Sequence, residues 1–171
     1  MEEMLYSPKD LAKIIIQNGM SIRESYEFIR RVWEKEKAYL EHTYQENQSK
    51  LILEVMKYCN ILHDEEGFTQ EARNISQYHN VLNEIDYRIL DTFFKEIRLK
   101  ICILGPQKYV KRKLRTVLSE YGYQRRSKRF NEYLKMCLYF YHIETYLRDR
   151  ERCDIEEVGV DDMIIFRVIG E

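Results

Sequence analysis

The sequence predicts a mainly α-helical protein, in which a long antiparallel helical hairpin is followed by a helix pair and a small C-terminal β-hairpin. Apolar side chains recur at helical spacing over most of the 171 residues. Glycine and proline are scarce, at six and two residues, and they fall where helices are expected to end. A β-branched run near the C-terminus predicts strand. With 44% hydrophobic residues, the chain is able to bury a core.

The first expected element is a short helix from Pro8 to about Asn18. Ser7 has the chemistry of an N-cap, Pro8 suits the first helical position, and Asp10 supplies the carboxylate of a capping box. Gly19 is the expected stop, because glycine readily adopts the left-handed conformation that ends many helices. A second capping box, residues 21–24, predicts that another helix begins at once.

Residues 22–62 predict one long helix. Their apolar positions follow a 4-3-4 rhythm that repeats every eleven residues, which keeps one face of a nearly straight helix buried. Lys37 and Gln48 are the polar residues in this stripe. The polar stretch 42–50 is an alternative point of interruption.

A turn at residues 63–67 is expected to lead into a second long helix. Its apolar stripe extends from Ala72 to Leu104, and Gly105-Pro106 ends it. Two long helices joined by a short turn are expected to pack antiparallel. Residues 1–105 therefore form the predicted helical arm, a candidate surface for homodimerisation or docking.

Residues 106–171 form the second predicted domain. A helix is expected from about residue 107 to 121, with Gly122 as its stop, and a second from about 127 to 147. The segments CDIEEV (153–158) and MIIFRV (163–168) are expected to pair as a β-hairpin.

Charge is concentrated in residues 108–135. This segment holds ten Lys or Arg and two acids, whereas the whole chain has 28 basic and 29 acidic residues. The remaining 143 residues therefore carry 18 basic and 27 acidic side chains, an excess of nine negative charges. An unequal distribution of this kind predicts an anionic partner for the segment.

Motifs for catalysis and cofactor binding are missing from the sequence. There is no Walker A loop, no G-x-G-x-x-G, no G-x-S-x-G and no zinc-ligand spacing, so the expected function is non-enzymatic, without cofactor or metal. The four cysteines are widely spaced and are expected to be reduced core thiols. An acidic N-terminus and the lack of a long apolar run predict a cytoplasmic protein with no membrane span.

The order of a basic helix, a turn, a second helix and a β-hairpin resembles the second half of a winged-helix domain. This resemblance implies that the helix beginning after Ser127 enters the major groove of DNA, anchored by Phe130, Leu134 and Leu138, with Glu132 among the groove-facing residues. It also implies phosphate contacts from the turn and the preceding helix. The candidate nucleic-acid-binding residues are Lys108, Lys111, Arg112, Arg115, Arg125, Arg126, Lys128, Arg129 and Lys135.

The expected partner is therefore nucleic acid, DNA in preference to RNA. Two other interpretations stay open: the basic segment binds an acidic protein surface or promotes self-association, or it is an ordinary solvated face. If the segment binds an acidic protein surface or promotes self-association, the chain is a non-enzymatic helical scaffold or adaptor. The acids Glu156, Glu157, Asp161 and Asp162 are interpreted as a solvated edge that discourages strand-to-strand aggregation.

Overall fold

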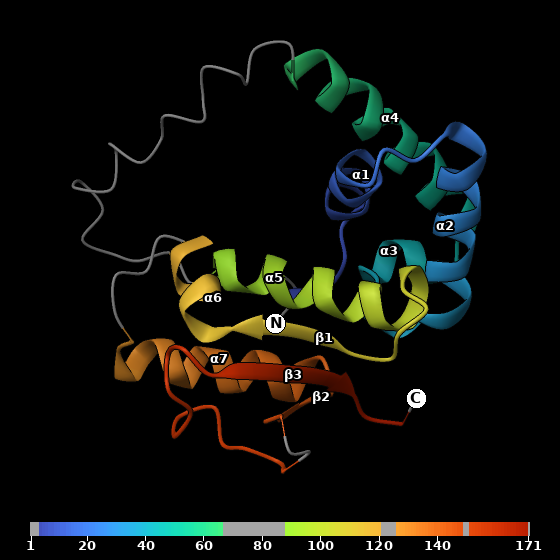
Figure 1. Cartoon of the computed structure of the whole chain (residues 1–171). Helices are drawn as coiled ribbons and strands as arrows, with labels where there is room; N and C mark the ends of the chain where they lie inside the picture. Colours follow the sequence, from blue (N-terminus) through green and yellow to red (C-terminus); the bar gives the residue numbers. More distant parts are fainter. Residues whose placement is uncertain (1–3, 67–87, 121–125, 149–150, 171) are drawn as a thin grey trace. The chain divides into compact units, whose positions relative to one another are not determined.

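The computed structural model describes residues 4–66, 88–120, 126–148 and 151–170 (Figure 1). The chain divides into two units, Met1–Asn80 and Val81–Glu171. The fold is mainly helical, with a small three-stranded antiparallel sheet in the second unit. The expected boundary at residue 105 differs from this division, which groups the helix before Gly105 with the C-terminal unit.

The first unit begins with the two predicted capped helices, α1 (Pro8–Gln17) and α2 (Ile22–Lys35). Both predicted capping boxes are present: the Ser7 backbone N–H donates to the Asp10 carboxylate at 3.0 Å, and the Ser21 N–H donates to Glu24 at 2.8 Å. Gly19 has φ +59°, the left-handed conformation expected of the residue that ends α1. Local capping chemistry therefore predicted both helix starts.

The prediction of one continuous helix over residues 22–62 is wrong. The chain instead forms α2, a 3₁₀ turn (Lys37–Tyr39), a short α3 (His42–Gln45) and α4 (Gln48–Glu66). At the break, the Tyr6 N–H donates to the Tyr39 carbonyl at 2.6 Å, and the Glu41 N–H donates to the Tyr6 carbonyl at 3.2 Å. This pairing with the N-terminal segment holds Leu40 in extended conformation and buries its side chain completely.

Part of the predicted apolar stripe is nevertheless buried on both sides of the break, although its first two positions, Ile22 and Tyr26, are exposed. Ile29 and Val32 on α2, and Leu51 and Val55 on α4, are all fully buried, and α1 packs against α4. The predicted turn at residues 63–67 is wrong for residues 63–66, which continue α4. Residues 67–87, which include Gly67 and the first part of the second predicted helix, lie outside the described residues. The predicted hairpin as a whole is therefore not described.

The second unit begins with α5 (Arg88–Leu99), which continues into a π-helical turn (Lys100–Leu104). The helix ends where Gly105 was expected to end it. The Gly105 N–H donates to the Lys100 carbonyl at 2.7 Å, and a Cβ at this position would lie only 2.7 Å from the same oxygen. The close approach of the two backbones therefore requires glycine.

The expected helix over residues 107–121 is present only from residue 114, the expected helix over residues 127–147 ends at Phe140, and the expected strand at 153–158 is wrong. Strand β1 (Val110–Lys113) precedes a shorter α6 (Leu114–Glu120), and α7 (Lys128–Phe140) stops before β2 (Ile143–Tyr146). The predicted strand β3 (Met163–Val168) is present, but it lies between β1 and β2, antiparallel to each, in the order β1-β3-β2. Residues 153–158 belong instead to the connection from β2 to β3.

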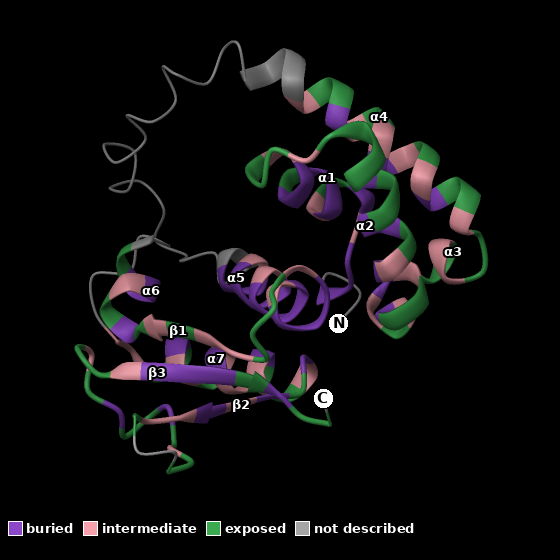
Figure 2. Ribbon diagram, turned by 45° about the vertical axis from the view of Figure 1, so that its right-hand side comes forward, coloured by how far each residue is buried: buried purple, intermediate pink, exposed green. Residues whose placement is uncertain are grey.

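The core of the second unit lies between α5, α7 and one face of the sheet (Figure 2). The Phe166 ring of β3 packs edge-on against Phe93 and Phe94 of α5, with centroid distances of 5.8 Å and 6.3 Å. Phe94 also stacks on Tyr141, which follows α7. The basic residues of this unit are therefore displayed on a scaffold with an aromatic core.

Candidate nucleic-acid interface

Helix α7 is fixed in place by its cap and by its apolar face. The Phe130 N–H donates to the Ser127 hydroxyl at 3.1 Å, as expected of an N-cap. Phe130, Leu134 and Cys137 are buried, whereas the predicted anchor Leu138 is only half-buried. These three buried residues are spaced four and three apart, so they lie on one side of the helix, which faces the core, and the opposite side is exposed.

The C-terminal end of α7 is held by a buried polar network. The Tyr141 hydroxyl donates to the Asp91 carboxylate, and the Lys95 ammonium lies 2.9 Å from Asp91. The Arg98 guanidinium donates to the Tyr141 carbonyl at 2.5 Å. These three α5 side chains are buried. A buried charge is tolerated when it is paired in this way, so the network fixes α5 and α7 relative to one another.

The exposed side of α7 has a basic beginning and an apolar end. Lys128 has 91% of its side chain exposed and lies 3.9 Å from Glu132, and Arg129 is exposed beside it. Further along, Met136 is 44% exposed and Tyr139 is 86% exposed. The first turn of α7 therefore presents exposed positive charge, and its last turns present exposed apolar and aromatic surface.

The β2–β3 connection, residues 147–162, neutralises part of the predicted basic site. It contains seven acids and three basic residues. Lys135 of α7 lies 2.7 Å from Glu156 and 3.3 Å from Asp154. The hydrogen bond with Glu156, and then that with Asp154, raise the pKa of Lys135. Glu156, one of the acids expected to form a solvated edge, is thus an ion-pair partner of the basic segment.

Arg115 of α6 makes a second contact of this kind. Its guanidinium donates two hydrogen bonds to the Asp161 carboxylate, at 2.6 Å and 2.8 Å, and its backbone N–H donates to the Val160 carbonyl at 2.7 Å. The side-chain hydrogen bonds hold the pKa of Asp161 below its ordinary value. The paired geometry is specific, although both side chains are exposed and solvent screens their attraction.

The Arg126 side chain is hydrogen-bonded to other residues of the protein. Its guanidinium donates to the Asn131 side chain at 2.8 Å, to the Val158 carbonyl at 2.6 Å and to the Ile155 carbonyl. One side chain therefore joins the start of α7 to the β2–β3 connection. Backbone carbonyls occupy the donors that a phosphate was expected to take.

The remaining predicted residues lie on β1 and next to it. Lys108 and Lys111 are exposed, and Arg112 is half-buried and donates to the Lys111 carbonyl at 2.9 Å. Arg125 lies outside the described residues. Because β1 replaces the expected helix, these side chains project from a sheet edge and do not continue the surface of a helix.

Sequence reasoning missed a group of side chains on the sheet. The Arg167 guanidinium lies 5.4 Å from the Tyr146 ring centroid and 6.0 Å from that of Tyr109, and the Lys111 ammonium lies 5.2 Å from Tyr109. The signal was present in MIIFRV, where Arg167 interrupts an apolar run on a strand. Tyr109, Lys111 and Tyr146 are distant from Arg167 in sequence, so the residue pattern within MIIFRV does not predict that they lie beside it.

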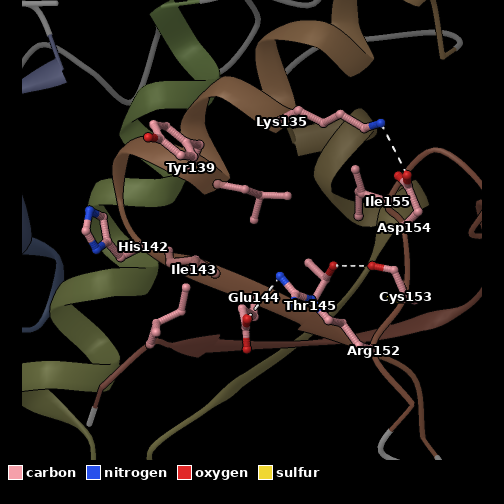
Figure 3. Close-up of a pocket in the computed structure, with 12 residues that line it drawn as sticks. Lys135, Tyr139, His142, Ile143, Glu144, Thr145, Arg152, Cys153, Asp154 and Ile155 are labelled. Atoms are coloured by element: carbon pink, nitrogen blue, oxygen red, sulfur yellow. Dashed lines mark hydrogen bonds and ion pairs between the residues drawn. The ribbon is translucent and has the colours of Figure 1, made fainter.

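A groove of about 580 Å³ lies between α7, β2 and the β2–β3 connection (Figure 3). Tyr139 lines one side, and Arg152 pairs with Glu144 at 3.0 Å on another. The Thr145 hydroxyl donates to the Cys153 carbonyl at 2.8 Å. The lining mixes both signs of charge with apolar side chains, which indicates no single ligand class.

Within the described ranges, no three potential metal ligands come together. The described helices include none that is both long and apolar enough to cross a membrane. Comparison of the chain with protein-family models, curated proteins and solved structures gives no match.

Proposed function

We propose that the chain is a nucleic-acid-binding protein that docks the beginning of α7 on DNA, with the β2–β3 connection alongside as a wing. The order of elements in the second unit carries this proposal: helix, strand, helix, helix, strand, strand. A helix pair followed at once by two antiparallel strands is the arrangement of a winged helix, and here β1 completes the sheet beside β3. In such domains the second helix of the pair enters the major groove.

The contacts of the basic residues support a role for the first turn of α7. Lys128 and Arg129 lie on the exposed first turn of α7, where they reach phosphates or base edges. Arg115 and Lys135 are paired with acids of the β2–β3 connection, so a phosphate has to compete for them. Lys128 also lies 3.9 Å from Glu132, so the affinity for DNA is expected to be modest.

The test is a double charge reversal, Lys128→Glu with Arg129→Glu, measured by fluorescence anisotropy with a labelled DNA duplex. Lys9→Glu with Lys13→Glu on α1 is the matched control, since both lysines are exposed and the change in net charge is identical. If two phosphate contacts are lost, the slope of log affinity against log salt falls by about two. Equal losses in both variants, or no binding by wild type at low salt, contradict the proposal.

A second candidate function, a helical adaptor, is favoured by exposed apolar side chains in the first unit. Ile22 and Tyr26 on α2 are 70% and 47% exposed, and Leu53 on α4 is 67% exposed. Apolar side chains at this exposure suit burial against a partner helix or a second copy.

This alternative predicts an oligomer or complex that persists in about 1 M salt, because apolar burial is not screened as ion pairs are. Leu53→Glu is expected to dissociate such an oligomer, whereas Leu53→Met is expected to retain it. Sedimentation equilibrium measures the mass. If the protein is monomeric at all concentrations tested, it does not act through self-association.

A further inference from the structure

The three-stranded sheet has one face in the core and one face outside it. Phe166 and Ile164 of β3 are buried, and Phe166 packs on the α5 rings. Because neighbouring residues of a strand point to opposite faces, Ile165 and Arg167 lie on the other side. The register places Lys111 and Tyr146 on either side of Ile165, and Glu144 beside Arg167.

Cations and aromatic rings alternate along this outer face. The order Lys111, Tyr109, Arg167, Tyr146 follows from the three cation–ring distances of 5.2, 6.0 and 5.4 Å. Lys111 and Arg167 are exposed, and both tyrosines are half-buried, so part of each tyrosine side chain is accessible to solvent. We call these four side chains the cation–aromatic ladder.

The charge on this face is positive. Lys113 of β1 adds a further exposed cation, opposite Met163. The acid of β2, Glu144, is already engaged: it accepts a hydrogen bond from the Tyr146 hydroxyl at 2.5 Å and pairs with Arg152 at 3.0 Å. An anionic ligand therefore meets Lys111 and Arg167 beside a compensated Glu144, and Lys113 near Asp161, which is itself paired with Arg115.

We propose that the cation–aromatic ladder binds single-stranded nucleic acid. Bases stack on the Tyr109 and Tyr146 rings, and Lys111 and Arg167 contact the phosphates between them. Alternating rings and cations are the chemistry that single strands require, because every base has a π-face and every linkage a negative charge. A duplex hides its base faces in the stack, and an acidic peptide would use the cations but leave the rings unused.

This proposal is separate from duplex binding by α7, since it uses other residues and another probe. The experiment measures binding of a fluorescein-labelled twenty-residue oligothymidylate by anisotropy at low salt. Tyr146→Leu is expected to weaken binding about tenfold, within the range for loss of one base-stacking ring. Tyr146→Phe keeps the ring and loses the hydrogen bond to Glu144, so it is expected to bind within about twofold of wild type.

Several outcomes overturn the proposal. The first is that wild-type protein does not bind the oligothymidylate. The second is that Tyr146→Leu and Tyr109→Leu both bind it with wild-type affinity. The third is that polyglutamate of matched charge displaces the probe as well as unlabelled oligothymidylate does. Circular dichroism establishes that each variant is folded, and Tyr109→Leu serves if Tyr146→Leu does not fold, because Tyr109 lies outside the strands. Lys128→Glu with Arg129→Glu separates the two sites: it is expected to impair duplex binding while the oligothymidylate remains bound. If only this variant, and neither tyrosine variant, loses oligothymidylate binding, the single strand binds at α7.

Discussion

Arg126 shows how a predicted binding residue can be a structural one. Its guanidinium donates to Asn131, Val158 and Ile155, which no ammonium group can reproduce in the same plane. Arg126→Ala leaves two backbone carbonyls without these donors, and we expect the free energy of unfolding to fall by about 1–3 kcal/mol. Urea denaturation measures it. Arg126→Lys is expected to recover little of the loss, and full recovery would show that charge alone matters.

The cysteines provide a second test at the level of single residues. Cys59, Cys102 and Cys137 are buried and Cys153 is half-buried. Burial raises the pKa of the Cys59, Cys137 and Cys153 thiols, so less thiolate, the reactive form, is present at any given pH. At pH 8 we expect slow labelling of native protein by Ellman's reagent, with Cys153 reacting first. Cys153→Ser removes this first phase; an unchanged time course contradicts the assignment.

At the scale of elements, the sequence predicted what depends on neighbouring residues. Ser7 and Ser21 were recognised as caps, and Gly19 and Gly105 as ends, because each acts within one helical turn. The break after α2 depends on the backbone bridge between Tyr6 and Leu40. These residues are far apart in sequence, so no local pattern predicts the bridge. Lys37 and Gln48, the polar positions in the apolar stripe, lie within the break and at the start of α4.

The strands were missed for the same reason. Residues 110–113 and 143–146 are short, and their apolar and polar residues also fit a helix. Pairing with β3 decides their conformation, and β3 lies about twenty to fifty residues away along the chain. The candidate site inherited this error: Lys111 and Arg112 were placed on a helix, and the ladder around Arg167 was not predicted.

The β2–β3 connection is expected to respond to acid. Hydrogen bonds lower the pKa of Asp161, through Arg115, and of Asp154, through the Glu156 backbone and then Lys135. A carboxyl whose folded pKa is lowered contributes stability above its unfolded value, about 3.9, and loses it as pH falls through the folded pKa. The midpoint of thermal unfolding should therefore be higher for wild type than for Asp161→Asn at pH 7, and the two midpoints should converge as pH falls through the folded pKa of Asp161.

The same variant also tests how the acids influence binding. Asp161→Asn releases Arg115 from its paired contact and removes a negative charge beside the proposed DNA surface. We expect tighter duplex binding at pH 7 and a steeper salt dependence, because one more cation is available to phosphate. Glu157→Gln, an exposed acid of the same connection, controls for the change in net charge. Equal effects of both variants contradict a specific role for the Arg115–Asp161 pair.

At the scale of the whole molecule, the division of the chain decides which part can act alone. The sequence placed the boundary at residue 105, before the basic segment, whereas the structure groups α5 with the sheet. Phe93, Phe94 and Ile97 of α5 are buried, and the two rings pack on Phe166. The buried Asp91 carboxylate accepts the Tyr141 hydroxyl hydrogen bond, so α5 contributes polar as well as apolar contacts to this core.

A fragment of residues 81–171 is therefore expected to unfold cooperatively, and a fragment of residues 106–171 is not. The shorter fragment exposes Phe166 and Ile164, and loss of a buried Phe side chain alone typically costs about 3–5 kcal/mol, a large part of the stability of a small domain. Circular dichroism during heating, with the dispersion of amide signals in NMR spectra, distinguishes a folded from an unfolded fragment. The longer fragment is also expected to retain binding of both nucleic-acid probes, because α7 and the cation–aromatic ladder both lie within it. A folded fragment of residues 106–171 would place the boundary at residue 105 after all, and would show that α5 is dispensable for the sheet.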